Sequence, residues 1–325
     1  MAPTGVTICL HKVPSTISED GCVLDFHPEQ NYYKLKEEYL RKGKLFTDPY
    51  FKASSESLGY DKLGPRTWVS QKTTWKRPKD ICEHGTPKFM EKGMTRHDVL
   101  QTTLGDCWFM AAAASLTFHP QLLARVVPLD QSFEEREYAG IFHFQFWQYG
   151  RWVDVVVDDL LPVLNGELRF AGHNDDFWMP LLEKAYAKLN GSYEAIDGGW
   201  LNEAFVDLTG GIGVRINLKQ KQKKLFETIE MALERKSLLG AGISDFKGVV
   251  DSKGLQGGHA YSIIGTHKLT IEGKKVRLVK LRNPWGHTEW TGNWSDSSEM
   301  WSKVDSEHQK TLIEEKENKD DGEFW

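Results

Sequence analysis

The chain has 325 residues, a net charge of −5, and 40% hydrophobic residues that include 12% aromatic residues. This composition supplies a large core, and the length favours two domains of ordinary size. The acidic balance gives no basis for nucleic-acid binding. No apolar run approaches the roughly 20 residues of a membrane-spanning helix, and residues 1–13 lack the continuous apolar segment of a signal peptide.

The cysteines have no regular spacing along the chain; they are Cys9, Cys22, Cys82 and Cys107. Together with the missing signal peptide, this predicts a reducing, cytoplasmic location, which suits a free thiol.

The first predicted element is a short amphipathic helix between Gln30 and Lys42. Its apolar positions are Tyr33, Leu35, Tyr39 and Leu40. We interpret residues 1–43 as a peripheral segment. The helix in it either lies on the surface or anchors the chain against a neighbouring domain or partner.

A cysteine stands next in the chain at the start of a helix-forming run. Gly105-Asp106 is typical of a turn, and the alanine-rich residues 108–116 are strong helix formers. Cys107 is therefore expected in the first turn of this helix. A helix N-terminus favours negative charge and lowers a thiol pKa, which produces a nucleophile. The backbone N–H of Cys107 and the side-chain amide of Gln101 are the natural donors to an oxyanion. Taken alone, the segment fits a buried, inert cysteine equally well.

Two elements with clear periodicity follow. Phe142, Phe144 and Phe146 alternate with less apolar residues, and residues 152–157 continue after Tyr149-Gly150, which predicts a β-hairpin. Apolar residues then recur at helical spacing until Asn190-Gly191. They are Trp178, Leu181, Leu182, Ala185, Tyr186 and Leu189. We interpret this stripe as core.

The glycine pair Gly198-Gly199 separates a helix-rich part from one with more strand character. Strands are expected at residues 237–243, 259–269 and 276–282, the last two joined by a turn at Glu272-Gly273. We therefore predict an α+β fold of two lobes, residues 44–199 and 200–325.

A base and its orienting partner are expected in the second lobe. His259 enters an apolar strand after a glycine pair, and Asn283 ends another strand. Cys, His and Asn occur in this order, with about 150 residues between the first two, as expected of papain-like enzymes. His259 would accept the thiol proton, while the Asn283 amide holds the imidazole and Trp285 covers that hydrogen bond. A structural histidine and an Asn-Pro turn are the alternatives, and the complete set disfavours both.

Six strings of the sequence resemble the protease core of the calpain family, calcium-dependent cysteine endopeptidases of the cytosol. They are residues 104–108 (LGDCW), 182–188 (LEKAYAK), 190–194 (NGSYE), 258–262 (GHAYS), 282–286 (RNPWG) and 321–325 (DGEFW). The resemblance implies a papain-like fold with the active site in the cleft between the lobes. Thr102, Met110 and Gly257 depart from the family pattern, which usually has Gly, Leu and Lys there. None of these departures removes a catalytic group.

The resemblance also implies two calcium sites that are not EF-hands, one in each lobe. In the first lobe the implied ligands are Asp98 and Asp176 with the carbonyls of Glu91 and Gly93. In the second they are Glu289, Asp296, Asp321 and Glu323 with the carbonyl of Lys319. Without the resemblance, these acidic clusters would be read as solvated surface.

Three residues depart from, or add to, this calcium pattern. Asp176 stands where Glu is usual, and its shorter side chain is expected to weaken the first site. Arg96 and Glu323 match an ion pair that links the two sites in the family. Calcium is expected to rotate the lobes so that Cys107 and His259 meet and Trp285 leaves the cleft.

The predicted function is a calcium-regulated intracellular cysteine endopeptidase that makes limited cuts in proteins. One alternative is a catalytically weak calcium-sensing scaffold with the protease fold. A transglutaminase is another, but its third catalytic residue is an aspartate where this chain has Asn283. Family members commonly add a C2-like domain and a penta-EF-hand domain that binds a small regulatory subunit. Trp325 ends the chain inside the implied calcium motif, where a natural domain is expected to run on, so we expect an excised core or a shortened product. A calpastatin-type inhibitor is a further partner that the family suggests.

Overall fold

A computed structural model gives the fold and describes residues 5–10, 23–82, 86–90, 93–172, 176–220, 222–243, 252–304 and 321–325. The α-helices are α1 (Tyr32–Lys42), α2 (Ser55–Leu58), α3 (Trp68–Lys72), α4 (Pro78–Ile81), α5 (Cys107–Leu116), α6 (Pro120–Val126), α7 (Trp178–Asn190), α8 (Leu201–Thr209) and α9 (Leu225–Glu234). Short 3₁₀ turns are η1 (Arg96–Asp98), η2 (Glu194–Ile196) and η3 (Glu299–Lys303). None of the described helices has the length and apolar character needed to cross a membrane.

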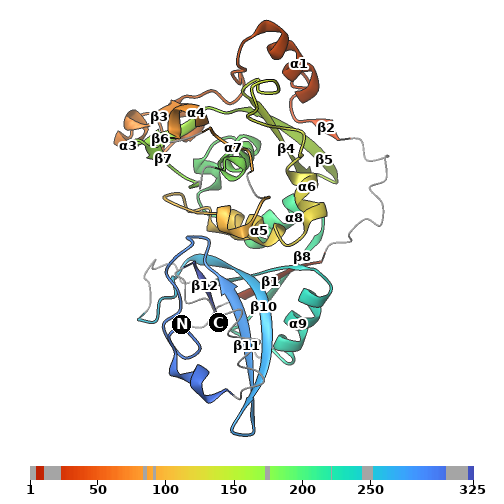
Figure 1. Ribbon diagram of the computed structural model, residues 1–325, viewed down its shortest axis with the longest axis vertical. Coiled ribbons are helices and arrows are strands. Elements are labelled where there is room, and N and C mark those ends of the chain that lie inside the picture. Colours follow the sequence, from red (N-terminus) through yellow and green to blue (C-terminus); the bar gives the residue numbers. More distant parts are fainter. Residues whose placement is uncertain are drawn as a thin grey trace.

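The strands form one large and two small sheets. They are β1 (Gly5–Leu10), β2 (Leu24–Asp25), β3 (Thr74–Lys76), β4 (Ile141–Gln148), β5 (Arg151–Asp158), β6 (Leu161–Leu164), β7 (Glu167–Leu168), β8 (Ile212–Asn217), β9 (Leu238–Ile243), β10 (His259–Ile271), β11 (Lys274–Arg282) and β12 (Glu323–Phe324). The large sheet has the order β12-β11-β10-β9-β1-β8, and the small ones are β2-β5-β4 and β3-β6-β7. The α+β class is confirmed, and Figure 1 shows the helix-rich lobe above the large sheet.

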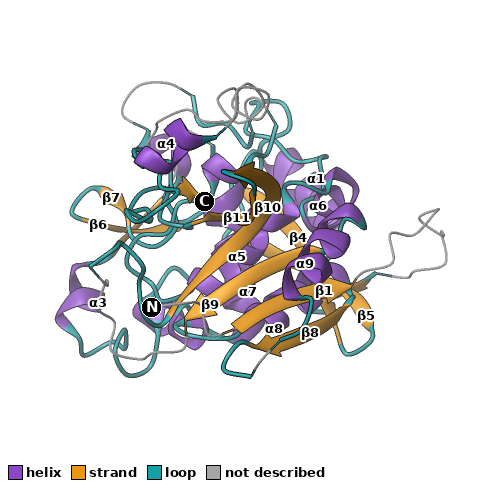
Figure 2. Cartoon of the chain, turned by 90° about the horizontal axis from the view of Figure 1, so that it is seen from below, coloured by secondary structure: helices purple, strands orange, loops and turns teal. Residues whose placement is uncertain are grey.

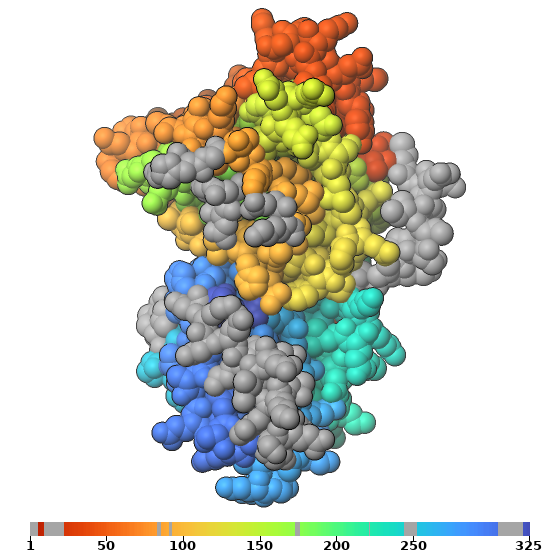
Figure 3. Space-filling view, viewed as in Figure 1, coloured from red at the N-terminus to blue at the C-terminus, as the bar shows by residue number. Residues whose placement is uncertain are grey.

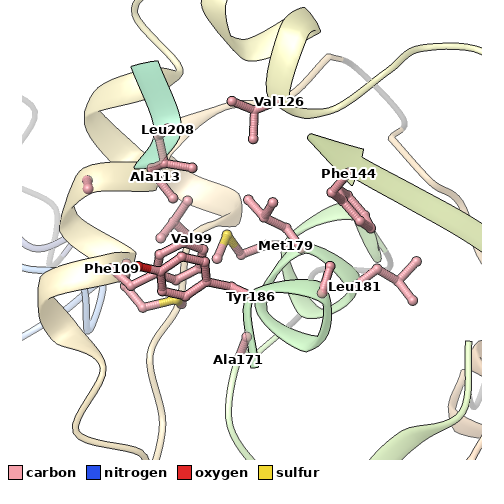
Figure 4. Close-up of a cluster of buried hydrophobic side chains, with 14 of the residues drawn as sticks. Val99, Phe109, Ala113, Val126, Phe144, Ala171, Met179, Leu181, Tyr186 and Leu208 are labelled. Carbon is pink, nitrogen blue, oxygen red and sulfur yellow. The ribbon is translucent and has the colours of Figure 1, made fainter. Parts of the chain in front are cut away.

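The core of the first lobe is built around α5 and α7. Every residue of α5 is buried, and the ring of Phe109 stacks on that of Tyr186 in α7 at 4.1 Å between centroids (Figure 4). Burying one such aromatic side chain stabilises the fold by about 1.5–3 kcal/mol. Cys107 therefore begins a helix that is fixed on all sides.

The hairpin and the strands of the second lobe form as predicted. In the β4–β5 pair, Phe142 lies opposite Val157 and Phe146 opposite Val153, and these phenylalanines are fully buried. In the large sheet, β10 and β11 are antiparallel and turn at Glu272 and Gly273, which both have positive φ. The turn brings the end of β11, and with it Asn283, back beside the start of β10.

The N-terminal residues have a more central place than the sequence suggested. Strand β1 lies between β9 and β8, inside the large sheet, although it belongs to the segment interpreted as peripheral. Its partners are more than 190 residues away by sequence number, so no local pattern identifies them. Helix α1 is present, and its N-cap is Asn31, whose side chain accepts a hydrogen bond from the Lys34 N–H.

The two lobes share a packed interface. Helix α5 lies against β9 and β10, where the Ser262 hydroxyl donates to the Ala111 carbonyl at 2.8 Å. Helix α8, just beyond the glycine pair, packs against α5 and β4 as well as β1 and β8. Figure 2 shows α9 over the opposite face of the sheet, and Figure 3 shows the two lobes as separate masses in contact.

Candidate active site

Cys107 opens α5 directly after Asp106, and its side chain is only 8% exposed. Backbone N–H groups of Ala260, Trp108 and Cys107 itself lie against the sulfur. Burial nevertheless raises the pKa of the thiol to about 12, because a thiolate loses its hydration there. The expectation that the helix N-terminus lowers this pKa is wrong for this arrangement, since desolvation exceeds the effect of the helix dipole.

His259 and Asn283 form a complete pair on the second lobe. The His259 Nε2 lies 2.8 Å from the Asn283 Oδ1, and the imidazole is 5% exposed. The Asn283 Nδ2 donates to the carbonyls of His287 at 3.0 Å and Thr288 at 2.9 Å. Because both amide hydrogens are used, Oδ1 must accept, so the network assigns a proton to Nε2 of His259. Nδ1 is then left as the basic nitrogen.

The His259 imidazole is neutral in this arrangement. Burial lowers its pKa to about 4, and the Asn283 hydrogen bond only partly opposes that shift. The Trp285 ring lies 4.5 Å from the imidazole ring, and its backbone N–H donates to Asn283 Oδ1 at 3.1 Å. Trp285 therefore covers the pair, in the position expected from the sequence.

A single cleft of about 970 Å³ joins the two halves. Gln101 and Cys107 line it from the first lobe, and His259 and Trp285 from the second. In the described part of the chain, the sulfur makes no hydrogen bond to the imidazole. The candidate catalytic groups thus face one cleft without being hydrogen-bonded to each other.

Gln101 is at the cleft, but its side-chain amide is occupied. Its Nε2 donates to the Leu104 carbonyl at 2.5 Å and to Asp106 Oδ1 at 3.2 Å. Its backbone N–H crosses to the other lobe and donates to the Pro284 carbonyl at 2.9 Å. The geometry can serve an oxyanion only after the side-chain amide leaves one of these partners.

The glycine pair before α8 forms part of the cleft wall. A Cβ on Gly199 would lie 2.3 Å from the Trp108 indole, so no larger residue fits without displacing that ring. Gly198 has a φ of 95°, which favours glycine, and its N–H donates to the Gly105 carbonyl at 2.9 Å. This segment is therefore held against the loop that precedes Cys107.

Two of the expected ligands of the first calcium site, Asp98 and Asp176, lie close to Trp178. Asp98 Oδ2 accepts from the Thr95 N–H at 2.7 Å and from the Trp178 indole at 3.2 Å. Asp176 is buried two residues before this tryptophan and forms a β-bridge with Lys88. Gly93 is described, whereas Glu91 lies outside the described residues.

The second set is partly assembled. Glu289 Oε1 accepts from the N–H groups of Asp321 at 3.1 Å and Gly322 at 2.9 Å, and Asp321 Oδ1 accepts from the Glu323 N–H at 2.9 Å. Asp296 follows in the loop after Glu289, and Lys319 lies outside the described residues. The donors are the carboxylate and carbonyl oxygens that calcium prefers, so their chemistry fits this ion. Over the described ranges, no three His, Cys, Asp or Glu side chains gather as a metal site.

An ion pair connects the two lobes close to these sets. Arg96 Nε in η1 binds Glu323 Oε1 in β12, and Lys280 Nζ lies 2.8 Å from Glu323 Oε2. The two cations outweigh burial and lower the pKa of Glu323. The pair expected from the resemblance is thus present in this structure.

Sequence reasoning missed two buried acids beneath the cleft. Asp106 is 0% exposed and Glu183 is 2% exposed, and their carboxyl groups lie within hydrogen-bonding reach of each other. Both acids stand in strings used for the family resemblance, but nothing local indicates that two acids so far apart in sequence meet.

Comparisons with known proteins agree with the geometry. The model of the calpain family cysteine protease domain matches residues 46–325. The chain is 52% identical to calpain-12 of Mus musculus over 299 residues, which is 91% of this chain and 41% of that protein. It is 50% identical to the calpain-2 catalytic subunit of Bos taurus over 303 residues, 91% of this chain and 42% of that protein. The chain therefore spans about two fifths of the length of the curated relatives it matches. By family model and by identity to these relatives, this chain belongs to the calpain family of cysteine proteases.

Proposed function

We propose that the chain is a calcium-regulated cysteine endopeptidase that makes limited cuts in protein substrates. The observation that carries the proposal is the shared cleft, with the Cys107 thiol on one wall and the Asn283-oriented imidazole of His259 on the other. A thiol, a base with a free Nδ1 and an orienting amide are the groups that acyl transfer through a cysteine requires.

In the first half of the reaction, Cys107 Sγ attacks the scissile carbonyl carbon and its proton passes to His259 Nδ1. The carbonyl oxygen becomes an oxyanion, which accepts hydrogen bonds from the Cys107 N–H and from Gln101 Nε2 once that amide leaves Leu104 or Asp106. The tetrahedral intermediate collapses, the C–N bond breaks, and the His259 proton goes to the leaving amine. A thioester on Cys107 remains.

In the second half, His259 Nδ1 takes a proton from a water molecule, whose oxygen attacks the thioester carbonyl. The C–S bond then breaks, the acid product leaves, and the proton returns to sulfur. Throughout, Asn283 keeps Nε2 protonated and the ring fixed, because its own amide is held by the His287 and Thr288 carbonyls.

The reaction requires the two lobes to move relative to the described arrangement. The thiol and the imidazole are both neutral and are not hydrogen-bonded to each other, which fits a resting state. We propose that closure brings Cys107 Sγ to His259 Nδ1 while Trp285 leaves the cleft. The lobes are taken as residues 44–199 and 200–325, with residues 1–43 as an N-terminal segment outside both, although its strand β1 lies in the large sheet.

We propose that calcium drives this closure by binding one site in each lobe. Asp98, Asp176 and the carbonyls of Glu91 and Gly93 would hold it in the first lobe. The second site would use Glu289, Asp296, Asp321, Glu323 and the carbonyl of Lys319. Bound calcium would supply positive charge that offsets carboxylate repulsion and favours one arrangement of the oxygens. Arg96 would keep Glu323 in place, and with it the relative position of the two sites.

Location and partners follow from family membership as proposals. We propose a cytoplasmic protein whose substrates are other proteins. A calpastatin-type inhibitor, and a small regulatory subunit that binds domains beyond these residues, are the further partners we propose.

The test is hydrolysis of casein by the chain and by Cys107→Ser, each titrated with calcium. Hydrolysis that needs both calcium and Cys107 is the expected result. Full activity in excess chelator would contradict calcium control. Equal inertness of both proteins at saturating calcium would instead support a calcium-sensing scaffold, and calorimetric calcium titration of Asp98→Asn and Glu289→Gln in the Cys107→Ser background would then report binding alone.

A further inference from the structure

Two buried carboxyl groups lie side by side beneath the cleft. Asp106 precedes α5 and Glu183 lies in α7; neither carboxylate belongs to an ion pair within the described residues. Asp106 Oδ2 and Glu183 Oε1 are buried and receive no hydrogen bond from another group. Two carboxylate oxygens are both acceptors, so contact between these acids requires a proton held between them.

The remaining oxygen of each acid is fixed by a donor. Gln101 Nε2 donates to Asp106 Oδ1 at 3.2 Å, and the Ala171 N–H donates to Glu183 Oε2 at 3.2 Å. Gln101 and Ala171 are themselves paired in an isolated β-bridge. The two acids therefore accept hydrogen bonds from both residues of this bridge, one of which is Gln101, the expected oxyanion donor.

The surroundings keep one proton on the pair at neutral pH. Burial raises the pKa of Asp106 to about 7, and burial together with the charge of Asp106 raises the pKa of Glu183 well above its usual value. The other ionisable groups that face the pair are the Asp197 carboxylate, the Tyr193 phenol and the Cys107 thiol. None of them is a cation that would favour loss of the shared proton.

We propose that Asp106 and Glu183 share one proton and act together as a positioning pair for the Gln101 amide in the proposed endopeptidase reaction. With one proton, Asp106 Oδ1 stays an acceptor for Gln101 Nε2, and the carboxyls stay in contact. Loss of that proton places two negative charges side by side in a buried site, so the pair separates and the oxyanion donor loses its support. This inference rests on the proposed function, since it assigns a role within that reaction.

The kinetic test uses Asp106→Ala and Asp106→Asn, with Asp207→Asn as the matched control. Asp207 is a partly buried acid of α8; it accepts from the Tyr186 hydroxyl at 2.8 Å and makes no hydrogen bond to Gln101 among the described residues. Asp106→Ala should lower kcat about 100-fold, as loss of an oxyanion donor does, with KM within about threefold. Asp106→Asn should restore most of kcat, because its carbonyl oxygen still accepts from Gln101.

Alkylation of Cys107 by iodoacetamide separates positioning of the oxyanion donor from activation of the thiol, because alkylation forms no oxyanion. Alkylation of Asp106→Ala should proceed within about threefold of the wild-type rate. An equal loss of alkylation and hydrolysis in Asp106→Ala would overturn the proposal. So would a kcat for Asp106→Ala no lower than that of Asp207→Asn.

The pH dependence of kcat tests the shared proton. In Glu183→Gln the alkaline decline of kcat should move to higher pH, because the glutamine amide donates a hydrogen that does not titrate. An unchanged alkaline decline would contradict the shared proton.

An infrared measurement tests the pair without any activity. In Cys107→Ser, the carbonyl stretch of a protonated, buried carboxyl group should be present at neutral pH and should vanish in the same protein carrying Glu183→Gln. Absence of that band overturns the shared proton. Because this protein is inert by design, failure of the proposed function is recognised separately, as absence of casein hydrolysis by the wild-type chain.

Discussion

The two halves of the candidate site differ in how complete they are. The histidine half, which comprises His259, Asn283 and Trp285, has a fixed tautomer and a covered hydrogen bond. The nucleophile half, Gln101 with Cys107, has a protonated thiol and an amide that is bonded to its own loop. In the proposed mechanism the base is thus prepared before closure, whereas the nucleophile and the oxyanion donor depend on it. Under that proposal, control of activity acts on the first lobe's half of the site.

The largest expected effect comes from removing the prepared half. His259→Ala should lower kcat on the order of 10⁶-fold, because the thiol then loses the imidazole proposed as its base. His27→Ala is the matched control, since that ring stacks on Tyr50 in the other lobe at 4.2 Å. Casein hydrolysis at saturating calcium measures both. Activity of His259→Ala within about tenfold of wild type would mean that another group serves as the base.

The state of the nucleophile half can be measured by alkylation. With a thiol pKa of about 12, the reaction with iodoacetamide without calcium should rise with pH across the neutral range. In the proposed closed state, His259 would stabilise the thiolate. A thiol pKa near 7 would raise the fraction of thiolate about 10⁵-fold. The same change would lower the intrinsic reactivity of each thiolate by roughly the square root of that factor. Calcium should therefore accelerate alkylation at least about 100-fold. Equal rates with and without calcium would remove the contrast between the halves.

The prepared state of the base depends on Asn283. Asn283→Ala should lower kcat about 100-fold, because the imidazole loses its fixed orientation and tautomer. Asn190→Ala serves as the control, as that amide donates to the Tyr186 carbonyl at the end of α7. If the two variants retained equal activity, the hydrogen bond to His259 would not be what prepares the base.

A smaller effect is expected at the contact between the lobes. Arg96→Ala removes a partly exposed ion pair with Glu323, so the calcium concentration for half-maximal activity should change by only about two- to fivefold. Arg277→Ala breaks an exposed pair with Glu227 within the second lobe and should leave this concentration unchanged. A calcium titration followed by casein hydrolysis measures both. Identical shifts in the two variants would show that Arg96 has no special part in closure.

The smallest effect concerns stability and pH. Folding raises the pKa of this carboxyl pair, so between about pH 4 and pH 7 the folded chain keeps a proton that the unfolded chain has lost. The contribution of the pair to stability is therefore complete below about pH 4 and decreases as pH rises to about 7. Glu183→Gln removes one titrating group and should flatten this decline by up to about 1.4 kcal/mol per pH unit. Urea denaturation at several pH values measures the slope; an unchanged slope would show that Glu183 does not carry the proton.

Periodicity and residue chemistry predicted much of the fold and the composition of the site. The β4–β5 hairpin, the apolar stripe of α7 and the β10–β11 turn follow from local patterns, and Cys107 and His259 do share a cleft. The place of β1 was not predictable, because its partners are distant in sequence.

Local sequence patterns also do not predict which charged residues are buried. Glu183, Lys184 and Lys188 lie inside the first lobe because each meets a partner from elsewhere: Asp106, Asp158 and Asp48 respectively. The same limit explains the wrong direction for the Cys107 pKa. The helix N-terminus is visible in the sequence, but the amount of protein over the sulfur is set by contact between the lobes.

The central claim is that closure joins two halves which the resting structure keeps apart. Crystal structures of the Cys107→Ser protein with and without calcium test it most directly, by the distance from the substituted side chain to His259 Nδ1. We predict a distance within about 3.5 Å with calcium, and no hydrogen bond without it. The account would be contradicted if both structures showed the same separation although the wild-type chain hydrolyses casein only with calcium.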